Sequence, residues 1–123
     1  MIWSFEQIIK RPTVIYFWSI NSLNHLRNIH SKADELKVKY PEFDFIAINT
    51  NADRDSWKQI INRHGYDKNK EFRFQEPSKA MGHLIINTVN KSMIIDKNAI
   101  IIDNHTNLFN SRFEEELLGL LNQ

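Results

Sequence analysis

The chain contains no cysteine among its 123 residues. This absence excludes disulfide bonds, C-x-x-C redox motifs, cysteine zinc sites, iron–sulfur clusters and thiol nucleophiles. It does not indicate a compartment, because a protein without thiols is indifferent to the redox poise around it. Any function assigned to these residues must therefore do without a sulfur nucleophile.

A large net charge and long apolar runs are also missing. The 16 basic and 15 acidic residues leave a formal net charge of +1, so no overall field attracts nucleic acid or an anionic membrane. No stretch approaches the roughly 18 apolar residues that span a bilayer. The first six residues lack the basic start and apolar core of a signal peptide, although a signal or further domains could have been removed. We expect neither a nucleic-acid partner nor membrane insertion of this chain.

The rest of the composition is that of an ordinary globular domain. Hydrophobic residues make up 41% of the chain and charged residues 25%. A chain of this length can bury a core without a disulfide or a structural metal. No repeat, low-complexity tract or linker divides it, so we expect residues 1–123 to form a single domain.

Hydrophobic periodicity predicts an alternation of strands and helices. Apolar runs rich in β-branched and aromatic residues predict strands at 13–18, 43–48, 91–96 and 99–103, with a shorter one at 72–74. Capping residues followed by apolar residues at helical spacing predict helices that begin near Ser22, Ser56, Ser78 and Ser111. The resulting order is β-α-β-α-(β)-α-β-β-α. We expect an α/β fold with a mixed central sheet and helices on both of its faces.

Polar residues mark the ends of the first two helices. Asn21 or Ser22 is expected to cap the first helix at its start. Asp53 and Asp55 are interpreted as turn and cap residues before the second helix. Gly65 is expected to end that helix in the left-handed conformation.

Two further local patterns concern the last third of the chain. Lys97-Asn98 lies between two apolar runs and predicts a tight antiparallel hairpin. Ser111-x-x-Glu114 has the spacing of a capping box and predicts how the last helix begins.

Three segments resemble those of the TlpA/ResA-type thioredoxin-like family. Residues 17–25 (FWSINSLNH) are similar to the family's F-W-A-x-W-C-x-x-C segment, in which an aromatic strand runs into a helix that opens with the redox cysteines. Residues 46–51 followed by Trp57 resemble its second strand and turn, and residues 89–96 resemble its x-P-T-T-F-L-I-D strand. The resemblance extends from residue 13 to the C-terminus and implies the thioredoxin-like fold.

The departures from the family pattern concern the site. Ser22 and His25 occupy the positions of the two cysteines, and Asn90 stands where the family has its cis-proline. The resemblance therefore implies a redox-inactive member that acts as a binding or accessory module, in the bacterial cell envelope where the family usually works. Its groove for a protein or peptide partner would lie near Trp18, Asn21 and Lys91.

Other interpretations of the same positions stay open. Ser22 could be a nucleophile with His25 as its base, three residues on along one helix face, although helix capping is the simpler interpretation. His25 could bind a metal, but the five histidines form no H-x-x-x-H pair, and a partly exposed histidine is the simpler interpretation. Trp18 is interpreted first as a core residue. No cofactor is expected, and other domains of a longer envelope protein could carry the function instead.

Overall fold

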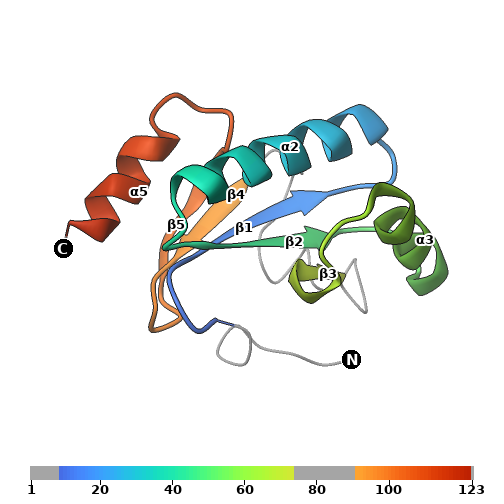
Figure 1. The fold of residues 1–123 in the computed structure, drawn as a ribbon, viewed down its shortest axis with the longest axis horizontal. Coiled ribbons are helices and arrows are strands. Elements are labelled where there is room, and N and C mark those ends of the chain that lie inside the picture. The colour runs from blue at the N-terminus through green and yellow to red at the C-terminus, as the bar shows by residue number, and fades with distance from the viewer. Residues whose placement is uncertain (1–8, 74–90, 123) are drawn as a thin grey trace.

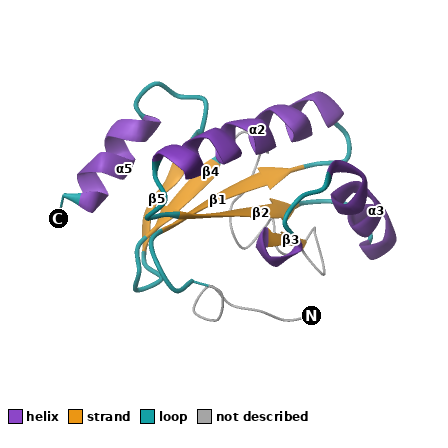
Figure 2. Ribbon diagram, viewed as in Figure 1, coloured by secondary structure: helices purple, strands orange, loops and turns teal. Residues whose placement is uncertain are grey.

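A five-stranded mixed sheet forms the centre of the protein, in the strand order β3-β2-β1-β4-β5. The structure is a computed structural model that describes residues 9–73 and 91–122, apart from the side chains of residues 104 and 105. Its strands are β1 (Thr13–Trp18), β2 (Asp44–Asn49), β3 (Glu71–Arg73), β4 (Ser92–Ile95) and β5 (Ile101–Thr106). Its α-helices are α2 (Leu23–Lys39), α3 (Arg54–His64) and α5 (Phe113–Leu121), and a 3-10 turn η1 (Lys68–Lys70) precedes β3. Figures 1 and 2 show this arrangement.

Strand β1 lies in the middle of the sheet and is buried along its whole length. It pairs in parallel with β2 and antiparallel with β4. Strand β2 pairs in parallel with β3, and β4 pairs antiparallel with β5. A central strand covered on both faces has no solvent side, which is why its sequence TVIYFW shows no polar alternation.

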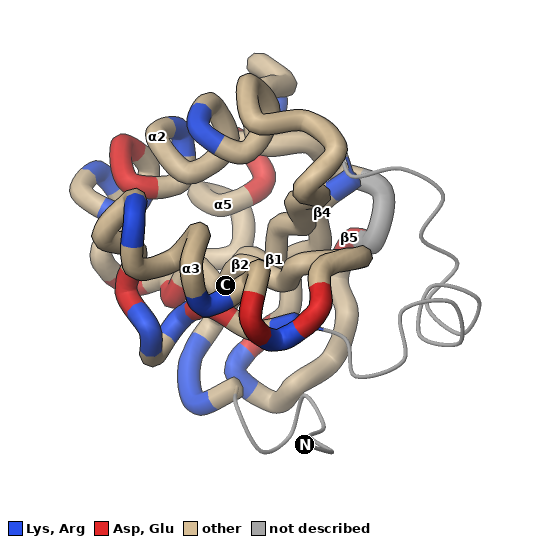
Figure 3. The backbone as a smooth tube through the Cα atoms, turned by 90° about the vertical axis from the view of Figure 1, so that its right-hand side faces the viewer, with Lys and Arg blue, Asp and Glu red and all other residues tan. Residues whose placement is uncertain are grey.

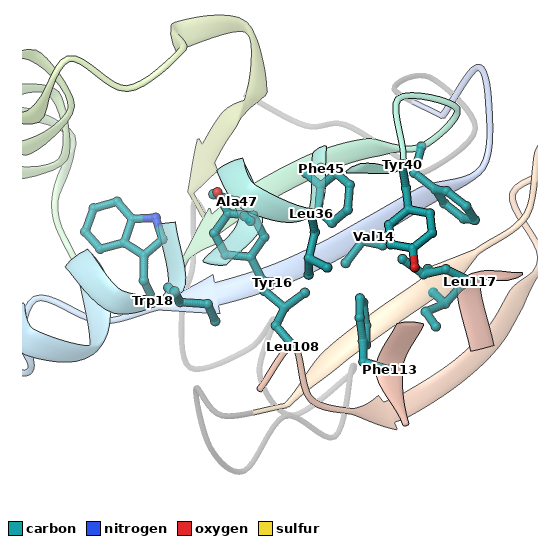
Figure 4. Packing of buried hydrophobic residues seen from close by; sticks show 14 of the residues in the cluster. Val14, Tyr16, Trp18, Leu36, Tyr40, Phe45, Ala47, Leu108, Phe113 and Leu117 are labelled. Atoms are coloured by element: carbon teal, nitrogen blue, oxygen red, sulfur yellow. The ribbon is translucent and has the colours of Figure 1, made fainter. Parts of the chain in front are cut away.

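Helices α2 and α5 lie on the same side of the sheet (Figures 1 and 2). The core between them and the strands includes Val14 and Tyr16 from β1, Leu36 from α2, and Phe113 and Leu117 from α5 (Figure 4). The opposite face of the sheet carries a second apolar cluster, made by Ile9, Ile15, Phe17, Ile46, Ile48, Met93 and Ile95. The helix expected to begin near Ser78 falls outside the described residues.

The ends of α2 and α3 follow the expected capping chemistry. Ser22, rather than Asn21, caps α2, and its hydroxyl oxygen accepts from the backbone N–H of His25 at 3.3 Å. Asp53 caps α3, and its carboxylate accepts from the N–H of Ser56 at 2.8 Å. Gly65 ends α3 with a φ of 70°, the left-handed conformation expected for it. Helix α3 begins two residues before Ser56 because Asp53 supplies the cap.

Two expected details in the C-terminal third are wrong: the capping box of the last helix and the bounds of the last strand. Helix α5 begins at Phe113 with Arg112 at its N-cap and no side-chain capping bond, so the predicted Ser111–Glu114 capping box does not form. Glu114 is instead occupied by contacts to the end of α2.

The last strand runs from 101 to 106 rather than from 99 to 103. The turn before it is longer than predicted because the Asp96 carboxylate accepts from the backbone N–H groups of Asn98 and Ile100. Ala99 adopts a φ of 64° within the same turn. These two features keep residues 99 and 100 out of the ladder.

Basic and acidic residues both occur on α2 and α3 rather than in blocks of one sign (Figure 3). This distribution agrees with the formal net charge of +1. Among the helices that the structure describes, none is both long and apolar enough to cross a membrane.

Candidate functional site

Ser22 and His25, the positions singled out at the start of the first helix, follow the carboxyl end of β1. Strands β1 and β2 are parallel, so their carboxyl ends meet at the same edge of the sheet. From Trp18 the chain turns through residues 19–22 into the first turn of α2 (Figure 1). Ser22 is therefore at the start of the helix and His25 lies within its first turn.

Hydrogen bonds tie this turn to the loop that follows β2. The Asn51 side-chain amide donates through Nδ2 to the Ser19 hydroxyl at 2.9 Å, and its oxygen Oδ1 accepts from the backbone N–H of Ile20 at 3.1 Å. The Ser19 hydroxyl oxygen also accepts from the N–H of Asn21 at 3.0 Å. Asn51, 32 positions away from Ser19 in the sequence, thus holds the first two residues of the turn.

The Ser22 hydroxyl is engaged by the backbone. Its oxygen accepts from the His25 N–H, which satisfies one of the free donors at the helix start. Within the described residues, no hydrogen bond joins this hydroxyl to the His25 imidazole. A serine nucleophile needs such a bond to a base, so the arrangement is that of a helix cap.

The His25 ring is shielded but unpaired. Within the described part of the chain, neither of its ring nitrogens has a hydrogen-bond partner, and both are closed to solvent. The ring meets Phe109 edge-on, with 6.4 Å between ring centroids. Burial lowers the pKa of His25, and the nearby His30 lowers it further. At neutral pH the ring is uncharged, with one N–H donor and one acceptor nitrogen unused.

Apolar side chains are exposed around this position. Ile20 in the turn is 37% exposed, Leu23 at the start of α2 is 51% exposed, and Phe109 beside His25 is 48% exposed. Isolated exposed apolar residues are common on protein surfaces. Here all three belong to, or contact, the short segment 20–25, where the resemblance places the family's cysteine positions.

The remaining predicted residues are placed as follows. Trp18 is fully buried, so it belongs to the core and its side chain does not line a surface groove. Asn21 is exposed and Lys91 is half-buried. Asn90 lies outside the described residues. No group of three His, Asp or Glu side chains in the described ranges is arranged to hold a metal ion.

A buried polar cluster beneath the turn was not predicted. His30 contacts the Leu26 carbonyl oxygen through Nδ1 at 2.8 Å and the Glu71 carboxylate through Nε2 at 2.9 Å. The other oxygen of Glu71 accepts from the Trp18 indole N–H at 3.2 Å. Tyr66 stacks flat on the His30 ring, with 3.7 Å between centroids. His30 could have been suspected, because it falls on the buried stripe of α2, but a single glutamate at a strand start gives no signal.

A parallel β1–β2 unit that opens into a capped helix, followed by the β4–β5 hairpin and α5, defines a thioredoxin-like fold. The sequence model of the family described as thioredoxin-like matches residues 10–101. The chain belongs to this family, as its three resembling segments predicted.

Solved structures with the same fold come from several bacteria. A proposed thiol-disulfide oxidoreductase from Bacteroides vulgatus superposes with a TM-score of 0.80 at 16% identity, over 96% of this chain and 78% of that one. A thiol-disulfide oxidoreductase from Bacteroides fragilis superposes with a TM-score of 0.71 at 16% identity, over 90% of this chain and 82% of that one. A thioredoxin-like protein from Parabacteroides distasonis superposes with a TM-score of 0.69 at 14% identity, over 99% of this chain and 88% of that one. No curated protein matches the chain.

Proposed function

We propose that this chain is a redox-inactive, TlpA/ResA-type thioredoxin-like domain that binds a protein or peptide partner. The binding face is the start of α2 with the turn before it, where relatives of this type place their cysteines. The cell envelope is the compartment we propose, on the basis of the family resemblance.

The chemistry of the two substituted positions supports the first half of the proposal. Thiol–disulfide exchange requires a thiolate that attacks a disulfide sulfur and forms a mixed disulfide. Neither a serine hydroxyl nor an imidazole forms that intermediate. Ser22 is also held as a helix cap, and within the described residues its hydroxyl makes no hydrogen bond to the His25 imidazole.

The observation that carries the binding role is the exposed apolar group around His25. Leu23 and Phe109 each expose about half of their surface, and Phe109 meets the His25 ring edge-on. A partner segment that covered Leu23 and Phe109 would bury apolar area, which is the main favourable contribution in protein association.

Site-specific crosslinking tests this proposal. A photoreactive amino acid at position 23 should capture a partner in cells, whereas the same amino acid at Val38, on the same helix and 84% exposed, should not. Leu23→Ser and Phe109→Ser should each weaken binding of the captured partner, measured by calorimetry with purified components. Val38→Ser is the matched control and should leave affinity unchanged. Equal capture at positions 23 and 38, or affinity insensitive to both site variants, would overturn the proposal.

A further inference from the structure

The His30–Glu71 contact is buried at both ends. The side chains of His30 and Glu71 are only 5% and 3% exposed, and their atoms Nε2 and Oε2 lie 2.9 Å apart. The other ring nitrogen, Nδ1, faces the Leu26 carbonyl oxygen at 2.8 Å. A carbonyl oxygen can only accept a hydrogen bond, so Nδ1 carries a hydrogen and donates it. This fixes one of the two hydrogens that the ring can hold.

The second hydrogen follows from the other contact. If Nε2 and Oε2 both lacked a hydrogen, two lone pairs would face each other at hydrogen-bond distance in a site closed to water, which is strongly unfavourable. A protonated imidazole with a carboxylate, or a neutral imidazole with a carboxylic acid, each places one hydrogen between the two atoms. We infer that His30 and Glu71 share a single proton, and that this proton fastens β3 to α2 and β1 beneath the turn that leads to Ser22.

The pair joins three elements around that turn. Glu71 is the first residue of β3, and its second oxygen accepts from Trp18 at the end of β1. His30 bonds to Leu26, one turn into α2. Trp18 immediately precedes residues 19–22 and Leu26 shortly follows them, so the pair holds the chain on both sides of the candidate site. The inference rests on this geometry and is independent of the proposed function.

Among the described residues, the other titratable groups that interact with the pair include Tyr16 on β1, Tyr66 after α3 and His25 on α2. Arg27 and Asp34 on α2 and His64 on α3 interact in turn with Tyr16 or Tyr66. Burial raises the pKa of Tyr16 well above its usual value, and burial with the charge of Glu71 raises the pKa of Tyr66 to about 12. Both phenols therefore stay neutral across the physiological range. Because the pKa of His25 is lowered, this residue changes stability with pH mainly in acid solution.

Sharing one proton makes the contribution of this pair to stability largest in mildly acidic solution. In the unfolded chain, glutamate titrates near pH ~4.3 and histidine near ~6.5. Above pH ~6.5 the unfolded chain holds no proton on these two residues while the folded pair holds one, so the folding constant falls up to tenfold per pH unit. Below pH ~4.3 the unfolded chain holds two protons and the folded pair one, so stability falls again as the pH drops.

Urea unfolding of the whole chain between pH 4 and 8.5 tests the inference with three variants. Glu71→Gln replaces the carboxylate with an amide that can donate to a neutral Nε2, so no shared proton remains. Between pH 6.5 and 8.5 the folding constant of the unmodified protein should fall relative to that of Glu71→Gln by about tenfold per pH unit. His30→Gln should behave like Glu71→Gln in this range. Glu35→Gln, with an exposed side chain on the same helix, should follow the unmodified protein.

If the ratio of the folding constant of the unmodified protein to that of Glu71→Gln stays constant between pH 6.5 and 8.5, the inference is overturned. A second measurement covers the case in which the variants fail to fold. In nuclear magnetic resonance spectra of the unmodified protein at pH 7.5, His30 should show hydrogens at both ring positions, or an unprotonated Nε2 beside a protonated Glu71 carboxyl. A ring with a free, unprotonated Nε2 and an ionised Glu71 at that pH would equally overturn it.

Discussion

The Tyr40 phenol donates to Oε1 of Glu114 at 2.7 Å, and this bond connects the end of α2 to the first turn of α5. Lys39 reaches the same oxygen at 2.6 Å. These two contacts lower the pKa of Glu114, with the Lys39 hydrogen bond as the larger cause. The same pairing raises the pKa of Lys39. A single carboxylate thereby fixes the C-terminal helix to the helix that carries the candidate site.

Glu114→Gln is expected to destabilise the protein at neutral pH and to have little effect in strong acid. A carboxyl group whose pKa is lowered by folding stabilises the protein above its unfolded pKa, and this contribution is lost as the pH falls through the folded value. Chemical denaturation at pH 7 and at pH 3 measures the difference. Glu115→Gln, at the exposed neighbouring position, is the control. An equal loss at both pH values would show that the charge of Glu114 is not the cause.

His25→Leu is expected to maintain or increase stability. The change removes two shielded nitrogens that have no partner in the described residues and leaves a side chain that can stay against Phe109, a gain on the order of 1 kcal/mol. Because folding lowers the pKa of His25, the unfolded chain binds the proton more readily and the histidine costs more stability as the pH falls. The gain should therefore be larger at pH 5 than at pH 8, as measured by thermal unfolding. A clear loss of stability at both pH values would mean that His25 has a partner.

Gly65→Ala and Gly119→Ala are expected to act in opposite directions. An added Cβ meets no atom within 4 Å at either position, so only the backbone conformation differs between them. Gly65 has a φ of 70°, where an L side chain is strained by about 1 kcal/mol or more. Gly119 lies within α5, where alanine is favoured by up to about 1 kcal/mol. Equilibrium unfolding of both variants measures the change in the free energy of unfolding. A stabilising Gly65→Ala change would contradict the left-handed conformation of Gly65 at the end of α3.

Replacing both Ser22 and His25 with cysteine is expected to yield an intramolecular disulfide. The two positions are three apart at a helix start, and thiol counting after mild oxidation should find no free thiol. The helix terminus should acidify the thiol at position 22. Exchange activity in an insulin-reduction assay should nevertheless stay weak, because the resemblance places Asn90 where the family has the proline that positions substrate, and the unmodified chain should show none.

The start of α3 offers a matched comparison for the cysteine pair. Asp53 and Ser56 have the same cap spacing and the same kind of side chain to N–H bond, so cysteines at 53 and 56 should also close. If that pair closes while the pair at 22 and 25 stays reduced, the two sequence positions do not correspond to the redox motif.

The elements predicted from the sequence are those with local causes. Strand β1 follows from an uninterrupted apolar run, the start of α2 from the Ser22 hydroxyl, and the end of α3 from Gly65. The start of β5 was misplaced because the turn depends on where the Asp96 side chain bonds, which periodicity does not encode.

The buried cluster escaped prediction for a different reason. Glu71 lies 53 positions from Trp18 and 41 from His30, and only the packing of β3 beside β2 brings the three together. The segment 20–25 was singled out because it resembles the family motif. The contact of Phe109 with this segment was not predicted, since Phe109 lies in a loop more than 80 residues further along the chain.

The bonds from Asn51 to Ser19 and Ile20 bear on the thermodynamics of recognition. A surface that is already ordered loses little conformational entropy on association, and each side chain left to be immobilised costs only about 0.5–1.5 kcal/mol. Encounter with a partner would then need no prior rearrangement of residues 19–22. Partners that differ in how well they cover Leu23 and Phe109 would associate at similar rates and be distinguished by how slowly they leave.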